Sequence, residues 1–87
     1  MERHEVVLSK SAARELGRIG TRTDRAKIVA ILGRLVDDPR PFGAIKLVTS
    51  LRSYRVRVGK YRIVYEIFDE RRIVDVIRIG HRRDVYE

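Results

Sequence analysis

Residues 53–79 alternate between apolar and polar side chains, and this period of two is the feature that most constrains the fold. Valine, isoleucine and tyrosine recur at every second position, which is typical of antiparallel strands with one buried and one open face. Gly59-Lys60 is a two-residue connection with glycine first, which suits a type II′ hairpin turn, and Asp69–Arg71 supplies a looser turn. We therefore expect three strands, at about residues 53–58, 61–68 and 72–79.

The beginning of the chain reads as one short strand followed by a helix. Residues 5–8 form the expected strand, after which Ser9 or Ser11 is placed to cap a helix. Gly17 weakens this helix and Gly20 ends it. Its apolar positions are spaced i, i+4 and i+7, as expected for one buried face, at Ala12, Leu16 and Ile19.

A second helix is expected from near Thr23 to Asp38, because Pro39 disfavours helical geometry in the residue before it. Its apolar stripe consists of Ile28, Ile31, Leu32 and Leu35. A helix pair with one apolar side needs a sheet to cover. The sequence therefore predicts an α+β fold, an antiparallel sheet of about four strands with an N-terminal two-helix hairpin packed on one face.

The chain has 87 residues and no cysteine. A chain of this length forms one domain, so we expect a single domain over residues 1–87, and the lack of cysteine excludes disulfides and thiolate chemistry. The first residues lack the apolar run of a signal peptide, and no stretch approaches the roughly 20 apolar residues of a membrane span. We expect a cytoplasmic protein that does not associate with membranes.

The formal net charge of +8 indicates an anionic partner, with nucleic acid as the leading candidate. The charge is concentrated in the second half, where residues 52–83 hold ten Lys and Arg against four Asp and Glu. A solvated basic surface is the alternative interpretation. Neither the two histidines nor the acidic residues have metal-ligand spacing, so we expect no metal and no cofactor.

The expected hairpin places three arginines on one face. A two-residue loop pairs Arg57 with Arg62, and Arg55 with Val64. Like charges directly across a strand pair are destabilising, so a bound polyanion accounts for the arginines better than solvent does, although solvated side chains remain an alternative. Because side chains alternate along a strand, the face toward the helices is expected to carry Val56, Val58, Tyr61 and Ile63.

Two segments together resemble a known family. The string Tyr54–Glu66, YRVRVGKYRIVYE, is followed by Gly80-His81-Arg82 and then by Asp84-Val85-Tyr86. This combination strongly resembles toxins of the RelE/ParE superfamily, in particular its RelE-like branch, and the resemblance covers nearly the whole chain. It implies a microbial-RNase-like fold and the toxin of a type II toxin-antitoxin system.

The RelE resemblance also implies an activity and partners. The toxin would enter the ribosomal A site and cleave messenger RNA there, inhibiting translation. The 2′-hydroxyl would attack the adjacent phosphate without a metal. The expected partners are the ribosome, its mRNA and a cognate RelB-like antitoxin, which would form a toxin-antitoxin hetero-oligomer.

Site residues follow from the matched positions. The candidate catalytic residues are Arg62, Arg82, Tyr86 and His81. The candidate RNA- and phosphate-binding residues are Arg55, Arg57, Lys60 and Arg83. Arginine does not readily exchange a proton, because its pKa exceeds about 12, so arginines would hold phosphate and stabilise charge. Proton transfer would then come from Tyr86, from His81 or from a ribosomal group.

Two alternative functions share these features. One is a ParE-like toxin that poisons gyrase and is not a ribonuclease. The other is a noncatalytic RNA-binding module, which predicts salt-sensitive binding without cleavage. The arginines, Gly80-His81-Arg82 and Tyr86 favour the RelE-like activity.

Overall fold

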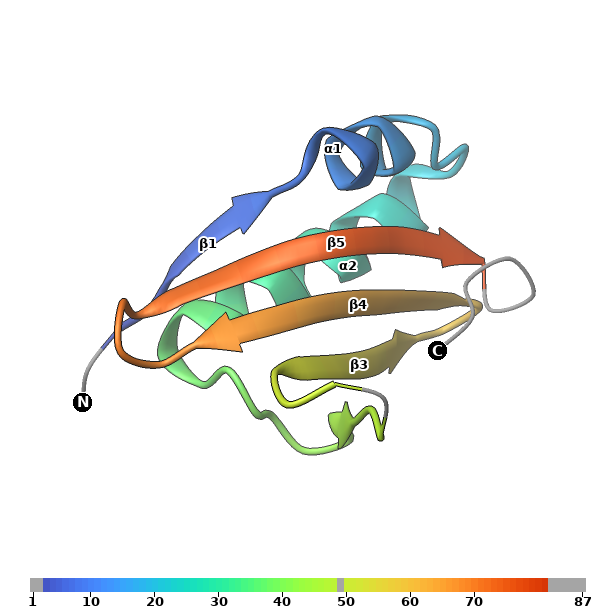
Figure 1. The fold of residues 1–87 in the computed structure, drawn as a ribbon. Helices are drawn as coiled ribbons and strands as arrows, with labels where there is room; N and C mark the ends of the chain where they lie inside the picture. The colour runs from blue at the N-terminus through green and yellow to red at the C-terminus, as the bar shows by residue number, and fades with distance from the viewer. Residues whose placement is uncertain (1–2, 49, 82–87) are drawn as a thin grey trace.

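The strands form one sheet with the order β1-β5-β4-β3-β2 (Figure 1). The computed structural model describes residues 3–48 and 50–81. Along the chain the elements are β1 (Glu5–Leu8), α1 (Lys10–Gly17), α2 (Arg22–Asp37), β2 (Ile45–Lys46), β3 (Ser53–Val58), β4 (Tyr61–Phe68) and β5 (Ile73–His81). The predicted α+β fold is confirmed.

The β3–β4 hairpin has the predicted register. Arg57 lies opposite Arg62, Arg55 opposite Val64, and Val58 opposite Tyr61. Gly59 has a φ of +59°, which a glycine adopts at little cost and which the first position of a type II′ turn requires. The turn therefore fixes which side chains of β3 and β4 share a face.

Two features of the sheet differ from the prediction. The first strand, β1, pairs parallel to β5, with Glu5 opposite Ile73 and Leu8 opposite Val76, while the other pairings are antiparallel. A parallel connection needs a long crossover, and the helices and strands between β1 and β5 supply it. The additional strand β2 has two residues, which is too short to show a period in the sequence.

Both helices begin at hydroxyl caps. The Ser9 hydroxyl accepts a hydrogen bond from the Ala12 amide at 3.0 Å, which selects Ser9 over Ser11 as the cap of α1. The Thr21 hydroxyl accepts from the Asp24 amide at 3.2 Å, so α2 begins at Arg22, slightly before the predicted start.

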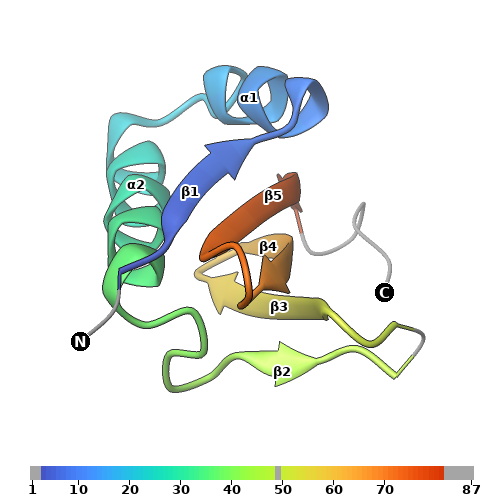
Figure 2. The same cartoon turned by 60° about the vertical axis from the view of Figure 1, so that its left-hand side comes forward.

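The core lies between the helices and one face of the sheet. In Figure 2, α2 runs along that face while α1 lies beside β1 and β5. The fully buried side chains include Tyr65, Ile28, Leu35, Ile63, Ile79, Val74 and Val76. The opposite face of β3, β4 and β5 has no helix over it among the described residues. No helix within residues 3–48 and 50–81 is long and apolar enough to cross a bilayer.

Candidate functional site

A row of open positions crosses the three central strands near the β3–β4 turn. Arg57 on β3 lies opposite Arg62 on β4, and Arg62 lies opposite Gly80 on β5. Adjacent strands are about 4.8 Å apart, so the row spans about 10 Å. Gly80 adds no side chain of its own to this row.

Arg55 extends this row toward the middle of the sheet. It follows two positions from Arg57 on the same face of β3, or about 7 Å along the strand. Arg55 and Arg62 are half-buried while Arg57 is exposed. Their neighbour Val64 is covered by Leu47, which forms a small second apolar cluster with it. Because Arg55 and Arg62 are half-buried, their stems have less freedom to lose when they bind an anion.

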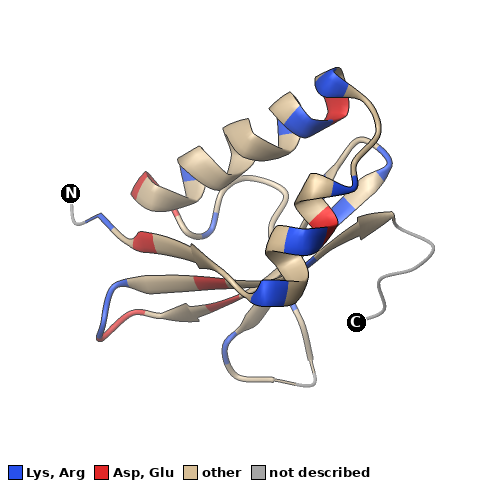
Figure 3. Cartoon of the chain, turned by 90° about the horizontal axis from the view of Figure 1, so that it is seen from above, with Lys and Arg blue, Asp and Glu red and all other residues tan. Residues whose placement is uncertain are grey.

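The other end of the open face carries charges of both signs. Glu66 on β4 lies directly opposite Asp75 on β5, and Asp69 and Glu70 follow in the next turn. Arg40 and Arg52 form ion pairs with Asp69 and Glu70, and Arg71 and Arg72 follow in the same turn. This end of the sheet therefore has mixed charge, whereas arginines gather at the β3–β4 end of the open face. Figure 3 shows that Lys and Arg also lie on both helices, so the clustering of Arg55, Arg57 and Arg62 on the open face, rather than the net charge, singles out the arginine end.

Lys60 and His81 occupy different surroundings. Lys60 is exposed in the β3–β4 turn, beside the arginine row. His81 is in register with Tyr61, whose side chain packs against the core on the helix side, and the two rings meet edge to face at 6.0 Å. The strand alternation thus places His81 with Tyr61, while Arg62 and Gly80 occupy the opposite face.

The structure brings Arg55, Arg57 and Arg62 together on one face. The predicted residues Arg82, Arg83 and Tyr86 lie outside the described residues. Within the described part of the chain, no group of three or more His, Asp and Glu side chains is arranged to hold a metal ion.

A depression next to β5 contains residues that sequence reasoning missed. It is lined by Glu15, Arg18, Ile19, Tyr61, Arg78, Ile79, Gly80 and His81. Glu15 belongs to α1, and its carboxylate accepts hydrogen bonds from the Arg78 side chain and the Ile79 amide. No local pattern links residues this far apart in the sequence, so only the fold reveals the contact.

A polar cluster near the β4–β5 turn holds the segment after α2 in place. Arg40 forms a 2.8 Å ion pair with Asp69 and donates a hydrogen bond to the Tyr54 hydroxyl at 3.1 Å. The hydrogen bond between Arg40 and Asp69 raises the pKa of Arg40 and lowers the pKa of Asp69. Tyr65 donates to the Pro39 carbonyl at 2.8 Å, and burial raises the pKa of its phenol. This cluster is structural and lies away from the arginine row.

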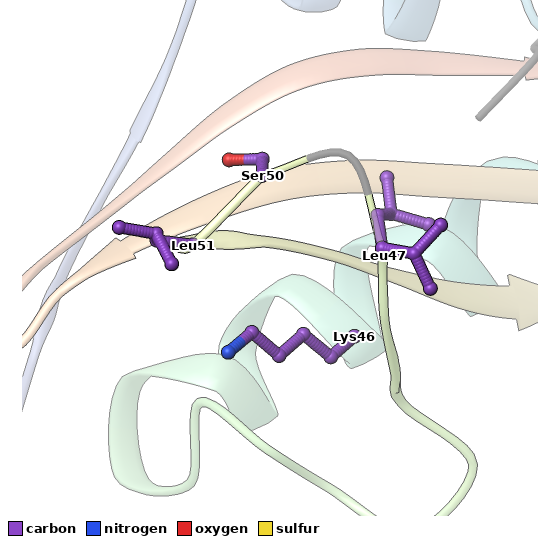
Figure 4. A pocket seen from close by; sticks show the side chains of 5 residues that line it. Lys46, Leu47, Ser50 and Leu51 are labelled. Carbon is purple, nitrogen blue, oxygen red and sulfur yellow. The ribbon is translucent and has the colours of Figure 1, made fainter.

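A second unpredicted feature is an apolar pocket in the segment that joins β2 to β3. It is lined by Lys46, Leu47, Val48, Ser50 and Leu51 (Figure 4). Val48 and the nearby Phe42 are fully exposed, and Leu51 is 82% exposed. Apolar side chains exposed together often mark contact surfaces for other macromolecules.

Comparisons with known proteins give the family. The model of the ParE toxin of the type II toxin-antitoxin system parDE matches residues 6–86. Toxin RelE of Mycobacterium tuberculosis is 31% identical over 84 residues, which cover 95% of this chain and 86% of that protein. Toxin RelG of the same bacterium is 29% identical over 83 residues, which cover 95% of each.

The fold agrees with the sequence comparisons. In the crystal structure of the RelBE2 toxin-antitoxin complex from M. tuberculosis, a chain with 29% sequence identity superposes with a TM-score of 0.78. The match covers 92% of this chain and 99% of that one. The resemblance inferred from the hairpin and the Gly80-His81-Arg82 segment is confirmed. The chain belongs to the ParE toxin family of type II toxin-antitoxin systems, within the RelE/ParE superfamily, and is a RelE-like toxin.

Proposed function

We propose that this toxin is a ribosome-dependent endoribonuclease that cleaves mRNA in the ribosomal A site without a metal ion and thereby inhibits translation. The observation that carries the proposal is the arginine row on the open face, formed by Arg55, Arg57 and Arg62 near the β3–β4 turn. An RNA backbone is the polyanion that fits this arrangement.

The chemistry follows from the charges. Attack of a 2′-hydroxyl on the adjacent phosphate gathers negative charge on the phosphorane oxygens, and guanidinium groups held at that position stabilise it. Arg62 is central in the row and is proposed as the principal contact to this charge. Arg55, Arg57, Lys60 and Arg83 would hold flanking phosphates.

The arginines do not supply proton transfer. Tyr86 is proposed as the base that accepts the 2′-hydroxyl proton, with Arg82 stabilising its phenolate, and His81 is the competing candidate. The position of His81 beside Tyr61, on the other face from Arg62, favours Tyr86 over His81. The ribosome would hold the message in line for attack, so little cleavage of free RNA is expected.

A cognate antitoxin is the proposed protein partner. M. tuberculosis RelBE2 is a toxin-antitoxin complex, and its similarity to this chain supports a RelB-like partner in a hetero-oligomer. An acidic antitoxin segment would neutralise the arginine row and keep RNA away from it. We propose a cytoplasmic site of action, where ribosomes and antitoxin are both present.

A cell-free translation reaction tests the proposed activity. Purified toxin is added, and new mRNA 5′ ends are mapped at nucleotide resolution. Cleavage within codons at the A site is expected. A gyrase supercoiling assay runs in parallel, because the matching family is named for ParE. Inhibition of supercoiling without new mRNA ends would support the gyrase alternative, and salt-sensitive RNA binding without either activity would support a noncatalytic module.

A further inference from the structure

On the edge that faces β1, the end of β5 extends past its partner strand. The pairing of β1 with β5 stops at Leu8 and Val76, while β5 continues to His81. Strand-edge amides and carbonyls need hydrogen-bond partners, and an edge without them is a weak point of a sheet. Residues 77–81 therefore depend on something other than β1 for support along this edge.

Helix α1 provides that support. At its N-terminus, the Ser9 amide donates to the Val76 carbonyl at 2.9 Å and the Ser9 hydroxyl donates to the Ile77 carbonyl at 3.0 Å. Two turns later, Glu15 Oε1 accepts from the Ile79 amide at 2.9 Å, and Glu15 Oε2 accepts from Arg78 Nε at 3.0 Å. Ser9 and Glu15 thus provide hydrogen-bond partners where β1 no longer pairs with β5.

The Glu15 contacts are well placed to be strong. The Glu15 side chain is 22% exposed, and both of its oxygens accept hydrogen bonds. Hydrogen bonds to an ionised carboxylate are shorter and stronger than neutral ones, and partial burial reduces their competition with water. Ile79 itself is 1% exposed, so its amide has little access to solvent as a substitute.

The same contact shapes the surroundings of His81. Glu15, Tyr61, Arg78 and His81 line one depression, and the His81 ring meets the Tyr61 ring within it. Gly80, between Ile79 and His81, stands opposite Arg62. The backbone that Glu15 anchors therefore borders the arginine row on one face and carries His81 on the other.

We propose that Glu15 is a positioning residue for RNA cleavage, whose carboxylate fixes the end of β5 through the Ile79 amide and the Arg78 side chain. This inference rests on the proposed function. Glu15 has no contact with the reacting atoms in this proposal. It holds the backbone opposite Arg62 in a defined place, and a displacement of about 1 Å at such a position is enough to cost about 100-fold in rate.

The test combines two readouts on Glu15→Ala and Glu15→Gln. The first is amide hydrogen exchange followed by NMR. We expect Ile79 to exchange at least about tenfold faster in Glu15→Ala, with the core amides of Ile63 and Val74 unchanged. The second is single-turnover cleavage on ribosomes, where the maximal rate should fall at least about tenfold while the half-saturating toxin concentration stays the same.

The glutamine variant gives the rescue. It retains an Oε1 acceptor for the Ile79 amide and loses the charge opposite Arg78, so exchange and rate should recover most of the way. Asp37→Ala is the matched control, because it removes an acid whose ion pair with Arg3 is exposed on both sides. This control should behave as the parental protein in both readouts.

The outcomes separate the two proposals. The positioning role would be overturned if the parental protein cleaves and Glu15→Ala cleaves at the same rate, or if the Ile79 amide exchanges equally fast in both proteins. Should Glu15→Ala fail to fold, Glu15→Asp decides the same question, because it keeps the negative charge on a side chain one methylene shorter and so weakens the hydrogen bond from the Ile79 amide. Faster exchange at Ile79 and slower cleavage are then expected, and parental values of both would overturn the positioning role. A parental protein that does not cleave on ribosomes would overturn the proposed function itself, while the exchange arm still reports whether Glu15 anchors β5.

Discussion

Removal of one buried hydroxyl should destabilise this fold by a predictable amount. Tyr65→Phe keeps the ring, which is 0% exposed and stacked on Tyr54 with a 6.1 Å centroid separation. It deletes the 2.8 Å hydrogen bond to the Pro39 carbonyl. A buried acceptor left without a donor costs about 1–3 kcal/mol. Because Pro39 is half-buried and accessible to water, we expect about 1 kcal/mol, a fall in Tm of about 4–8 °C.

The same variant should change the alkaline limb of stability. Burial raises the pKa of Tyr65 in the folded protein, whereas an unfolded phenol titrates near pH 10. The folded state therefore holds this proton more tightly. The stability that this raised pKa contributes is fully present below about pH 10 and is lost as the pH rises toward the folded pKa. Tyr65→Phe has no phenol here and should lose less stability above pH 10 than the parental protein.

Urea unfolding at pH 7 and at several values above pH 10 measures both effects. Tyr54→Phe is the matched control, because its hydroxyl accepts a near-surface hydrogen bond from Arg40, and Arg40 keeps its ion pair with Asp69 in this variant. The control should cost less than about 0.5 kcal/mol. Equal stability of Tyr65→Phe and the parental protein at pH 7, with the same alkaline limb, would refute this view of the buried hydroxyl.

Four further predictions concern catalysis and acid stability. Arg62→Ala should lower the single-turnover cleavage rate at least about 100-fold and leave the fold intact. Arg71→Ala, in the turn at the far end of the sheet, should keep the parental rate. Full activity in Arg62→Ala would count against the arginine row. Cleavage should persist when EDTA is added, and a parallel sample checks that the ribosomes stay intact at the remaining Mg²⁺ concentration. Complete loss of cleavage on intact ribosomes would contradict a metal-free reaction. Tyr86→Phe should fold, bind antitoxin and lose most cleavage, and parental rates in Tyr86→Phe together with inactivity of His81→Ala would make the histidine the base. Because Arg40 lowers the pKa of Asp69, that carboxylate contributes stability above its unfolded pKa near 4, and this stability is lost as the pH falls through the folded pKa. Asp69→Asn should therefore flatten the acid limb of a urea-unfolding series, by less than about 1 kcal/mol because the ion pair is exposed. An unchanged acid limb would exclude this contribution.

The parts of the fold that local chemistry determines could be predicted from the sequence. The Gly59-Lys60 turn fixes the register, so Arg57 opposite Arg62 followed from two residues and the strand period. Hydroxyl caps and apolar spacing likewise indicated both helices.

Long-range contacts could not be predicted in the same way. The parallel pairing of β1 with β5 depends on how the chain returns to the sheet edge, and nothing within residues 5–8 encodes its direction. The contact of Glu15 with Ile79 and the acidic pair of Glu66 and Asp75 arise only when the strands are aligned. His81 was grouped with the arginines by its position in the sequence, whereas the strand register places it beside Tyr61.

Cleavage of one message in two states tests the proposed activity most directly. A single mRNA is presented to the toxin either on ribosomes with an empty A site or free in solution, and 5′ and 3′ ends are followed at single turnover. The expected result is cleavage within the A-site codon on the ribosome, leaving a 2′,3′-cyclic phosphate, with little cleavage of the free message. Equal cleavage in both states, or intact message on the ribosome at saturating toxin, would contradict a ribosome-dependent endoribonuclease.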